Sequence, residues 1–277
     1  MNMEVIAFAN QKGGVAKTTS TYNIAALKAL SGKRVLMIDL DPQASLTILC
    51  GFMPGKSEFS TCNLFDGKSD PLDCGYLVKS VNSPEFTQPK QLSHTANQQG
   101  QQSLNLISAN LYIVPSDIEL AEVEQRIISK TAREKILSKS MRAFENYFDY
   151  VFIDCPPQLG ILTTNALVAA DKVIIPTKAE YLSYRGIRAL RHTIQNIIDE
   201  VLNEKLILEG FIITMFEKNI NDQRDMLEQF KKEAPVLGIV KKSADTYRSI
   251  LEGLPVVISQ AKSDVSIAYK EIAEKIS

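Results

Sequence analysis

Residues 3–30 read MEVIAFANQKGGVAKTTSTYNIAALKAL, and this stretch decides the fold. The apolar run Met3–Ala9 predicts a buried strand, and Thr18–Leu30 has apolar residues at helical spacing, with Gly32 as a C-terminal cap. The glycine-bearing loop Asn10–Lys17 joins the two. Backbone N–H groups of such a loop converge on an anion, and the helix N-terminus adds positive potential. A phosphate site is therefore expected here, with a plain glycine turn as the alternative.

The loop follows an uncommon version of the phosphate-binding pattern. The ordinary pattern G-x-x-x-x-G-K-[ST] fails twice, because Gln11 and Ala16 stand where it has glycine. The variant K-G-G-x-x-K-[ST] fits every position from Lys12 to Thr18. In this pattern Lys17 reaches the β- and γ-phosphates, and the Thr18 hydroxyl is a ligand of Mg²⁺. If the position of Ala16 needs a positive φ, alanine costs about 1 kcal/mol or more there.

The rest of the chain continues the alternation of strand and helix. Further buried strands are predicted at Arg34–Ile38, Leu111–Val114, Tyr150–Ile153, Val173–Ile175, Gly210–Met215 and Leu237–Val240. Helices are predicted at Ile118–Ile128, Ala132–Glu145, Ile161–Ala170, Tyr184–Leu202, Asp222–Lys232 and Ser263–Ile276. This order predicts an α/β fold with a doubly wound, mainly parallel sheet and helices on both faces. We expect one domain over residues 1–277, with a polar insertion at about residues 80–105 (Ser80–Asn105).

Composition excludes several classes of protein. The chain has 277 residues, of which 45% are hydrophobic and 23% charged, so it can bury a core without disulfides. It contains no apolar run of roughly 18 residues that would span a membrane, and Met1–Ala9 lacks a signal-peptide pattern. We therefore expect a cytoplasmic protein. The net charge of −1 means that any DNA contact must come from a local basic patch. The four cysteines form no C-x-x-C pair, which favours free thiols.

Two acidic segments follow predicted strands, and with the loop they point to a family. Residues 39–43 read DLDPQ after the second strand, and residues 151–157 read VFIDCPP. The loop resembles the deviant Walker A motif of the ParA/MinD family of dimerising P-loop ATPases, and these segments resemble its second motif and its Walker B strand end. Residues 110–122, 173–176 and 180–181 also match. The resemblance covers nearly the whole chain except residues 80–105, and the partition ATPases of the ParA branch are the most similar.

The resemblance implies a role for each of these residues. It implies a slow Mg²⁺-dependent ATPase whose Lys12 crosses a dimer interface to the partner's phosphates. Asp41 orients the attacking water, with a helix N-cap as the alternative for both Asp39 and Asp41. The residues expected to hold Mg²⁺ or its water shell are Thr18, Asp39 and Asp154. The alternative for Asp154 is an acidic residue that only forms a turn before Pro156. The nucleotide-binding residues are Gly13, Gly14, Val15, Ala16, Lys17, Thr18 and Thr19. Met215 and residues 240–243 are adenine candidates, with a core position as the alternative for Met215.

Partners follow from the same resemblance. Partition ATPases of this kind bind nonspecific DNA as ATP-state homodimers, associate with the nucleoid and respond to a ParB-type centromere-binding protein. The candidate DNA-binding residues are Lys241, Lys242 and Arg248, with Lys218, Arg185 and Arg188 as possible additions. The alternative is that Lys241 and Lys242 are ordinary solvated lysines. No helix-turn-helix segment precedes the first strand, so we expect a member of the short partition type without operator binding.

Other functions in the same superfamily stay open. A MinD-like membrane ATPase needs a basic, bulky amphipathic tail, whereas Ser263–Ser277 carries several acids and has the pattern of a closing helix. An iron-protein reductase needs a pair of cysteine ligands in glycine-rich loops, which this chain lacks. An ATP-dependent small-molecule ligase shares the phosphate loop but does not need Lys12. A non-hydrolysing scaffold does not need Lys17, Asp41 and Asp154 together.

Overall fold

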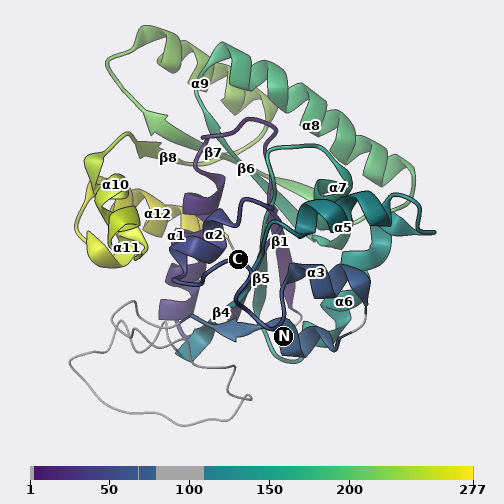
Figure 1. The fold of residues 1–277 in the computed structure, drawn as a ribbon. Helices are drawn as coiled ribbons and strands as arrows, with labels where there is room; N and C mark the ends of the chain where they lie inside the picture. Colours follow the sequence, from purple (N-terminus) through teal and green to yellow (C-terminus); the bar gives the residue numbers. More distant parts are fainter. Residues whose placement is uncertain (1–2, 68, 79–108, 277) are drawn as a thin grey trace.

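A single mixed sheet of eight strands organises the chain (Figure 1). The structure is a computed structural model that describes residues 3–67, 69–78 and 109–276. The strands, in chain order, are β1 (Glu4–Phe8), β2 (Val35–Asp39), β3 (Tyr76–Leu77), β4 (Leu111–Val114), β5 (Tyr150–Asp154), β6 (Lys172–Lys178), β7 (Ile207–Phe216) and β8 (Val236–Lys241). Their order across the sheet is β3-β4-β2-β5-β1-β6-β7-β8, and every pairing is parallel except β3 with β4.

Helices cover both faces of this sheet. The helices are α1 (Lys17–Leu30), α2 (Ser45–Leu49), α3 (Thr61–Asp66), α5 (Leu120–Ile127), α6 (Ile136–Phe144), α7 (Ile161–Ala169), α8 (Tyr181–Asp199), α9 (Asn221–Glu233), α10 (Ala244–Leu251), α11 (Val256–Ser259) and α12 (Asp264–Lys275). Two short 3₁₀ helices, η1 (Pro71–Cys74) and η2 (Arg133–Lys135), complete the set. The fold is thus the three-layer α/β arrangement that the alternation of elements predicts.

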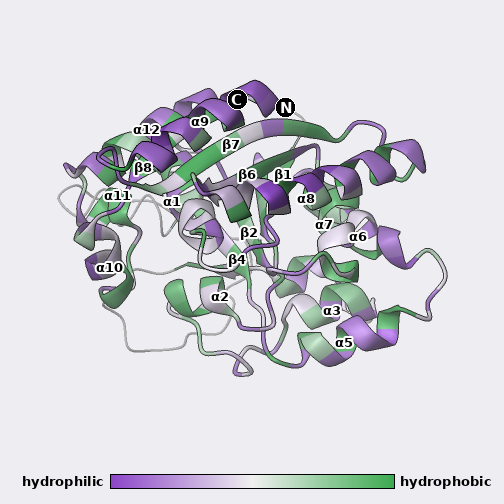
Figure 2. Cartoon of the chain, turned by 90° about the horizontal axis from the view of Figure 1, so that it is seen from above, coloured by the Kyte–Doolittle hydropathy of each residue, from purple (hydrophilic) through white to green (hydrophobic). Residues whose placement is uncertain are grey.

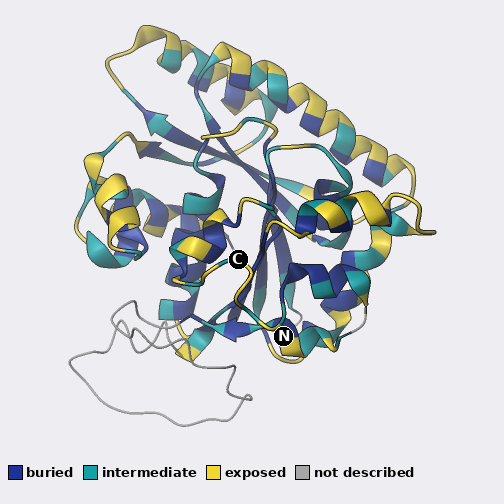
Figure 3. Cartoon of the chain, viewed as in Figure 1, coloured by how far each residue is buried: buried dark blue, intermediate teal, exposed yellow. Residues whose placement is uncertain are grey.

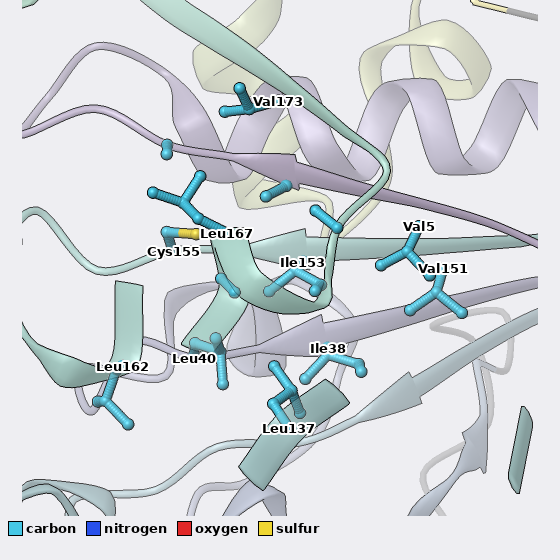
Figure 4. Close-up of a cluster of buried hydrophobic side chains, with 14 of the residues drawn as sticks. Val5, Ile38, Leu40, Leu137, Val151, Ile153, Cys155, Leu162, Leu167 and Val173 are labelled. Carbon is cyan, nitrogen blue, oxygen red and sulfur yellow. The ribbon is translucent and has the colours of Figure 1, made fainter. Parts of the chain in front are cut away.

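Alternate side chains of each central strand enter different cores, as the pleat requires. In β1, Val5 and Ala7 belong to the core beneath α3 and α5 to α9 (Figure 4). Ile6 and Phe8 belong to the core beneath α1, α2, α11 and α12. Both faces of the strand are therefore buried, which explains why its sequence is apolar from Val5 to Phe8 rather than alternating (Figure 3).

Most predicted elements are confirmed, and the differences have local causes. The predicted helix at 132–145 begins with the 3₁₀ turn η2, because Ala132 has a left-handed φ of 54°. The helices α2, α3, α10 and α11 and the antiparallel strand β3 were not predicted. The longest of these, α10, has eight residues, and the others are shorter. The proposed polar insertion at residues 80–105 lies outside the described residues.

The last helix closes the domain, as its sequence suggests. In α12 the side chains of Val265, Tyr269 and Ile272 are buried in the core shared with α1. Tyr269 also shares a hydrogen bond of 3.2 Å with the Ser20 hydroxyl of α1. Polar residues dominate the outer surfaces of α8, α9 and α12 (Figure 2). Across the ranges that the structure describes, no helix is both long and apolar enough to cross a bilayer.

Candidate active site

The site forms where β1, β2 and β5 end at one edge of the sheet. Parallel register places Phe8 opposite Asp154, and Asp39 opposite Asp154. The loop after β1 and the acidic segments after β2 and β5 therefore meet, although the segment after β5 lies more than one hundred residues beyond the other two in sequence. This edge, outside the carboxyl ends of parallel strands, is where open α/β sheets bind ligands.

The loop after β1 presents the N-terminus of α1 to solvent. Gly14 has φ 67°, and Ala16, the residue before the helix, has φ 60° and ψ 35°. Ala16 therefore occupies the left-handed region, and the strain of about 1 kcal/mol applies. No side chain caps the helix, and its first turn contains no acidic residue. The backbone N–H groups of that turn are left to an anion.

Lys17, Thr18 and Asp154 meet directly behind this loop. Lys17 is only 8% exposed, and its Nζ lies 3.5 Å from the Lys12 carbonyl oxygen, back across the loop. The Thr18 hydroxyl donates to Asp154 Oδ2 at 2.7 Å, and the Thr21 hydroxyl approaches Oδ1 at 3.4 Å. A hydroxyl beside a carboxylate, next to a phosphate loop, is the set of oxygen ligands that Mg²⁺ prefers.

Two buried carboxyl groups, Asp39 and Asp154, lie on neighbouring strand ends in this site. Burial raises the pKa of Asp154 to about 8, and neighbouring Asp39 raises it further against the opposing effects of Thr18 and Lys17. Burial also raises the pKa of Asp39 to about 6, although hydrogen bonds from Thr47 oppose the shift. Both groups are essentially inaccessible to solvent. A cation placed beside Asp154 would favour its charged form, so the residues present fit a magnesium ion.

Asp39 directs its oxygens to the chain rather than to open space. Its Oδ2 accepts hydrogen bonds from the Thr47 amide at 2.9 Å and the Thr47 hydroxyl at 2.7 Å. Its Oδ1 accepts from the Asp41 amide at 3.1 Å. Asp39 therefore supports the loop between β2 and α2.

Asp41 lies on that loop and is half-buried. Its Oδ1 accepts from the Gln43 amide at 2.9 Å, and its carbonyl oxygen accepts from the Ala44 amide at 2.8 Å. These contacts form a turn before α2, as the helix-cap alternative requires. The N-cap position of α2 is nevertheless occupied by Ala44, so no aspartate side chain caps that helix. Asp41 also lines a cavity of about 860 Å³.

Lys12 contacts residues at the start of α8 of its own chain. Its Nζ forms an ion pair with Glu180 Oε2 at 2.5 Å and donates to the Ser183 hydroxyl at 3.2 Å. Glu180 immediately precedes α8, and Ser183 lies in its first turn. The residues that hold Lys12 were not identified from sequence, and only the match of residues 180–181 to the family pointed toward them.

Met215 lies beside the phosphate loop. The preceding residue, Thr214, donates from its hydroxyl to the Val15 carbonyl at 3.1 Å and to the Thr177 carbonyl at 3.2 Å. Met215 is half-buried and has a left-handed φ of 52°. The adjacent stretch 240–243 is tied to the same strand end, because the Lys242 amide donates to the Phe216 carbonyl at 3.3 Å. The two adenine candidates are thus neighbours.

The candidate DNA-binding cations are exposed, and three of them carry carboxylate partners. Lys241 pairs with Asp264 at 2.7 Å, Lys242 with Glu217 at 3.3 Å, and Arg248 with Asp245 at 3.3 Å. These three surround the end of β8 and α10. The additional candidates Arg185 and Arg188 lie on α8, which is well separated from α10 in both views (Figures 1 and 2). Lys218 follows β7.

The cysteines take no part in a metal site within the described ranges. Cys50, Cys62, Cys74 and Cys155 are all buried free thiols. Burial raises the pKa of the Cys155 thiol, which keeps it protonated. No cluster of three or more histidine, cysteine, aspartate or glutamate side chains suited to a metal occurs in the part of the chain that the structure describes.

Comparison with known proteins identifies relatives along the whole chain. Residues 3–208 match the family described as AAA domain. The chain is 30% identical to the sporulation initiation inhibitor protein Soj of Bacillus subtilis, covering 99% of this chain and 98% of that protein. It is 30% identical to the chromosome partitioning protein ParA of Myxococcus xanthus, covering 98% and 87%. A Mycobacterium smegmatis structure, described as cobyrinic acid a,c-diamide synthase with a bound ATP analogue and magnesium, is 30% identical and superposes with a TM-score of 0.77, covering 98% of this chain and 93% of that one.

Proposed function

Because this chain belongs to the ParA-type P-loop ATPases, we propose that it hydrolyses Mg-ATP slowly and acts in plasmid or chromosome partition. In this proposal it forms a homodimer in the ATP state, binds nonspecific DNA in that state and responds to a ParB-type partner. The observation that carries the ATPase part is the contact between Thr18 and Asp154 behind an uncapped helix N-terminus. The partition part rests on the relatives.

The nucleotide would lie along the loop between β1 and α1. Residues Gly13 to Thr19 supply backbone N–H groups and the Lys17 ammonium for the phosphates. A Cβ added to Gly13 or Gly14 would meet nothing within 4 Å, so this side of the loop has room for a ligand. Mg-ATP would supply the phosphoryl group that passes to water. Thr18 and Asp154 would hold the metal and its water shell, and Met215 would contact the base.

Asp41 would orient the attacking water. The buried Asp39 fixes the loop that carries Asp41, because its carboxylate accepts hydrogen bonds from the Asp41 amide and the Thr47 amide. A carboxylate held on a fixed loop at the edge of the phosphate site is suited to accept a hydrogen bond from water. A spatial switch needs a long-lived ATP state, so we expect a slow basal rate.

Lys12 would complete the partner's site in the dimer. In the monomer its ammonium already has a partner in Glu180, so reaching across an interface exchanges one carboxylate for a γ-phosphate. This exchange favours the triphosphate state, because a phosphate carries more charge than a carboxylate. By analogy, an arginine finger supplied to a GTPase raises the rate of phosphoryl transfer by roughly 10³ to 10⁵.

DNA binding would use the cations around β8 and α10. Lys241, Lys242 and Arg248 have side chains that are 59%, 67% and 63% exposed. Exposed ion pairs of this kind contribute about 0 to 1 kcal/mol, so they can open when phosphates approach. Dimerisation would double the patch and thereby convert weak phosphate contacts into useful affinity.

The proposal is tested by measuring particle size with ADP and with a non-hydrolysable ATP analogue, with and without a DNA fragment. We expect a dimer only with the ATP analogue and DNA retention only in that state. Lys17→Ala should abolish nucleotide binding. Lys12→Ala should retain binding as a monomer, and Asp41→Ala should trap an ATP dimer with little hydrolysis. A wild-type chain that stays monomeric with the ATP analogue would refute the dimer, and equal DNA retention with ADP would refute the switch.

An ATP-dependent synthase is the second candidate, because a structure 30% identical to this chain is described as one. Such an enzyme consumes ATP in proportion to a small-molecule substrate, and the Lys12→Ala variant should remain active. A MinD-like membrane role has less support, since the apolar face of α12 is already buried against α1 and β8.

A further inference from the structure

The Thr47 hydroxyl of α2 joins the ends of two strands next to the loop that carries Asp41. Its oxygen accepts a hydrogen bond from the Ser116 amide, just after β4, at 2.8 Å. The same hydroxyl donates to Asp39 Oδ2, at the end of β2, at 2.7 Å. An amide N–H can only donate, so the hydrogen of the hydroxyl is left for the carboxylate and the direction of both bonds is fixed.

This hydroxyl lies where a hydrocarbon side chain would otherwise be favoured. Thr47 is 0% exposed and Ser116 is 1% exposed. A buried hydroxyl costs free energy unless it is hydrogen-bonded, and valine has nearly the same shape without that cost. The hydroxyl of Thr47 both donates and accepts here, so it supplies a connection that valine would lack.

The connection reaches Asp41 through the side chain of Asp39. Asp39 Oδ2 also accepts from the Thr47 amide at 2.9 Å, and Asp39 Oδ1 accepts from the Asp41 amide at 3.1 Å. Among the described residues, Thr47 thus supplies two of the three hydrogen bonds to this carboxylate. If the carboxylate rotates, the Asp41 amide loses its acceptor. The Thr47 hydroxyl therefore helps to fix the loop after β2.

A second buried hydroxyl holds the backbone of Asp39. Thr61, the first residue of α3, donates from its hydroxyl to the Asp39 carbonyl oxygen at 2.7 Å. Its amide donates to the Pro115 carbonyl oxygen at 2.8 Å. The end of β2 is thus tied to the residues after β4 through both the side chain and the backbone of Asp39. A loop that departs from such a fixed base holds its groups in place before the reaction.

We propose that Thr47 is a positioning residue for ATP hydrolysis, which holds Asp39 so that the Asp41 carboxylate stays aimed at the attacking water. This inference rests on the proposed function, which gives Asp41 that role. Thr47 is buried, so it acts through Asp39 rather than by touching the nucleotide. Its loss should therefore reduce turnover and leave nucleotide affinity unchanged.

The test compares Thr47→Val, which removes the hydroxyl, with Thr47→Ser, which keeps it. In Mg-ATP hydrolysis assays, Thr47→Val should lower kcat roughly 10- to 100-fold. The KM, and the Kd for a non-hydrolysable ATP analogue, should stay within about twofold of the wild type. Thr47→Ser should recover most of the lost kcat. The control, Tyr269→Phe, removes a buried hydroxyl of α12 that bonds to Ser20, and its kcat should equal that of the wild type.

Two further measurements separate positioning from a loss of stability. Adding Thr47→Val to Asp41→Ala should lower the residual rate no further, because Thr47 acts through Asp41. Amide hydrogen exchange at residues 40–47 should be faster in Thr47→Val and normal in Thr47→Ser, which reports on the loop without any turnover. Thr61→Val removes the other hydroxyl and should lower kcat in the same direction, which provides a second variant if Thr47→Val does not fold.

Three results would overturn the proposal. One is a wild-type kcat in Thr47→Val. Another is an equal loss of kcat in Thr47→Ser or in Tyr269→Phe, which would mean that any buried hydroxyl has this effect. The third is unchanged hydrogen exchange at residues 40–47 in Thr47→Val. If Asp41→Ala itself hydrolyses ATP at the wild-type rate, the proposed role of Asp41 fails, whereas the exchange measurement still decides whether Thr47 orders the loop.

Discussion

Replacing Asp154 with asparagine should make the ligand-free chain more stable at neutral pH, while removing its response to Mg-ATP. Asp154 is 1% exposed and lies beside Asp39, another buried carboxyl. Asparagine has nearly the same shape, and its side-chain oxygen can still accept the Thr18 hydroxyl. The substitution therefore removes a buried charge without creating a cavity.

The size of the effect follows from the pKa of Asp154. The ordinary value is 3.8, and burial together with Asp39 raises it to about 8 in the folded chain. The folded chain therefore holds this proton more tightly than the unfolded chain. Stability from this group is complete below pH 4 and is lost as the pH rises through about 8. At pH 7 the loss approaches roughly 4 kcal/mol, at 1.36 kcal/mol for each pH unit.

The expected gain is smaller than this limit. The asparagine variant also loses the attraction between the carboxylate and Lys17, which lowers the pKa of Asp154 in the native chain. We therefore expect the variant to be more stable by about 2 kcal/mol at pH 7, and by more at pH 8.5. Below pH 4 the two proteins should unfold at nearly the same urea concentration.

The assay is urea unfolding followed by circular dichroism, since the chain has no tryptophan. It is run in EDTA at pH 4, 7 and 8.5, with Asp225→Asn as the control because Asp225 is exposed on α9. Added Mg-ATP should then stabilise the wild type but not the Asp154→Asn variant. A variant that is less stable than the wild type at pH 8.5, or whose advantage is the same at every pH, would refute the reasoning.

Three further predictions concern the loop, its lysine and the sheet. Ala16→Gly should relieve the left-handed strain but add freedom to the unfolded chain. The free energy of unfolding, measured in urea, should therefore rise by less than about 1 kcal/mol. Glu180→Gln should release Lys12 and lower the protein concentration needed for an ATP-analogue dimer in sizing experiments, with stability unchanged within about 1 kcal/mol. Gly238→Ala should destabilise by about 1–3 kcal/mol, because its Cβ would lie 2.3 Å from Ile272 Cγ1. Adding Ile272→Ala should recover part of that loss in a double-mutant cycle.

The fold was predictable because its main signals are local. β1 is apolar from Val5 to Phe8 because both of its faces are buried, and α1 has apolar residues at helical spacing within a largely buried helix. The helices α2 and α3 have only five and six residues, so no apolar period develops. A capping box at Ser60 and Asn63 marks the start of α3, and this was the available signal. Strand β3 has two residues and depends on pairing with β4, which sequence periodicity does not report.

The site was predictable to the extent that its parts follow strands. The loop after β1 and the acids after β2 and β5 meet because parallel strands end at one edge. The contacts that decide roles were not predictable, since they join distant residues. Thr47 holds Asp39, and Glu180 holds Lys12, across 8 and 168 positions of the sequence.

Strain and buried charge concentrate at the edge of the sheet where the site lies. Of the described non-glycine residues with left-handed φ, Ala16, Ala44 and Met215 belong to this edge. Each such conformation costs of the order of 1–2 kcal/mol, and the pair Asp39 and Asp154 adds a charge penalty. These costs persist only because the core on both faces of β1 fixes the strand ends from which the loops depart. A bound phosphate and cation would offset the strain and the charge penalty, since the phosphate meets the helix N-terminus and the cation meets the carboxylates. Nucleotide should therefore stabilise the chain more strongly than its contact area alone suggests.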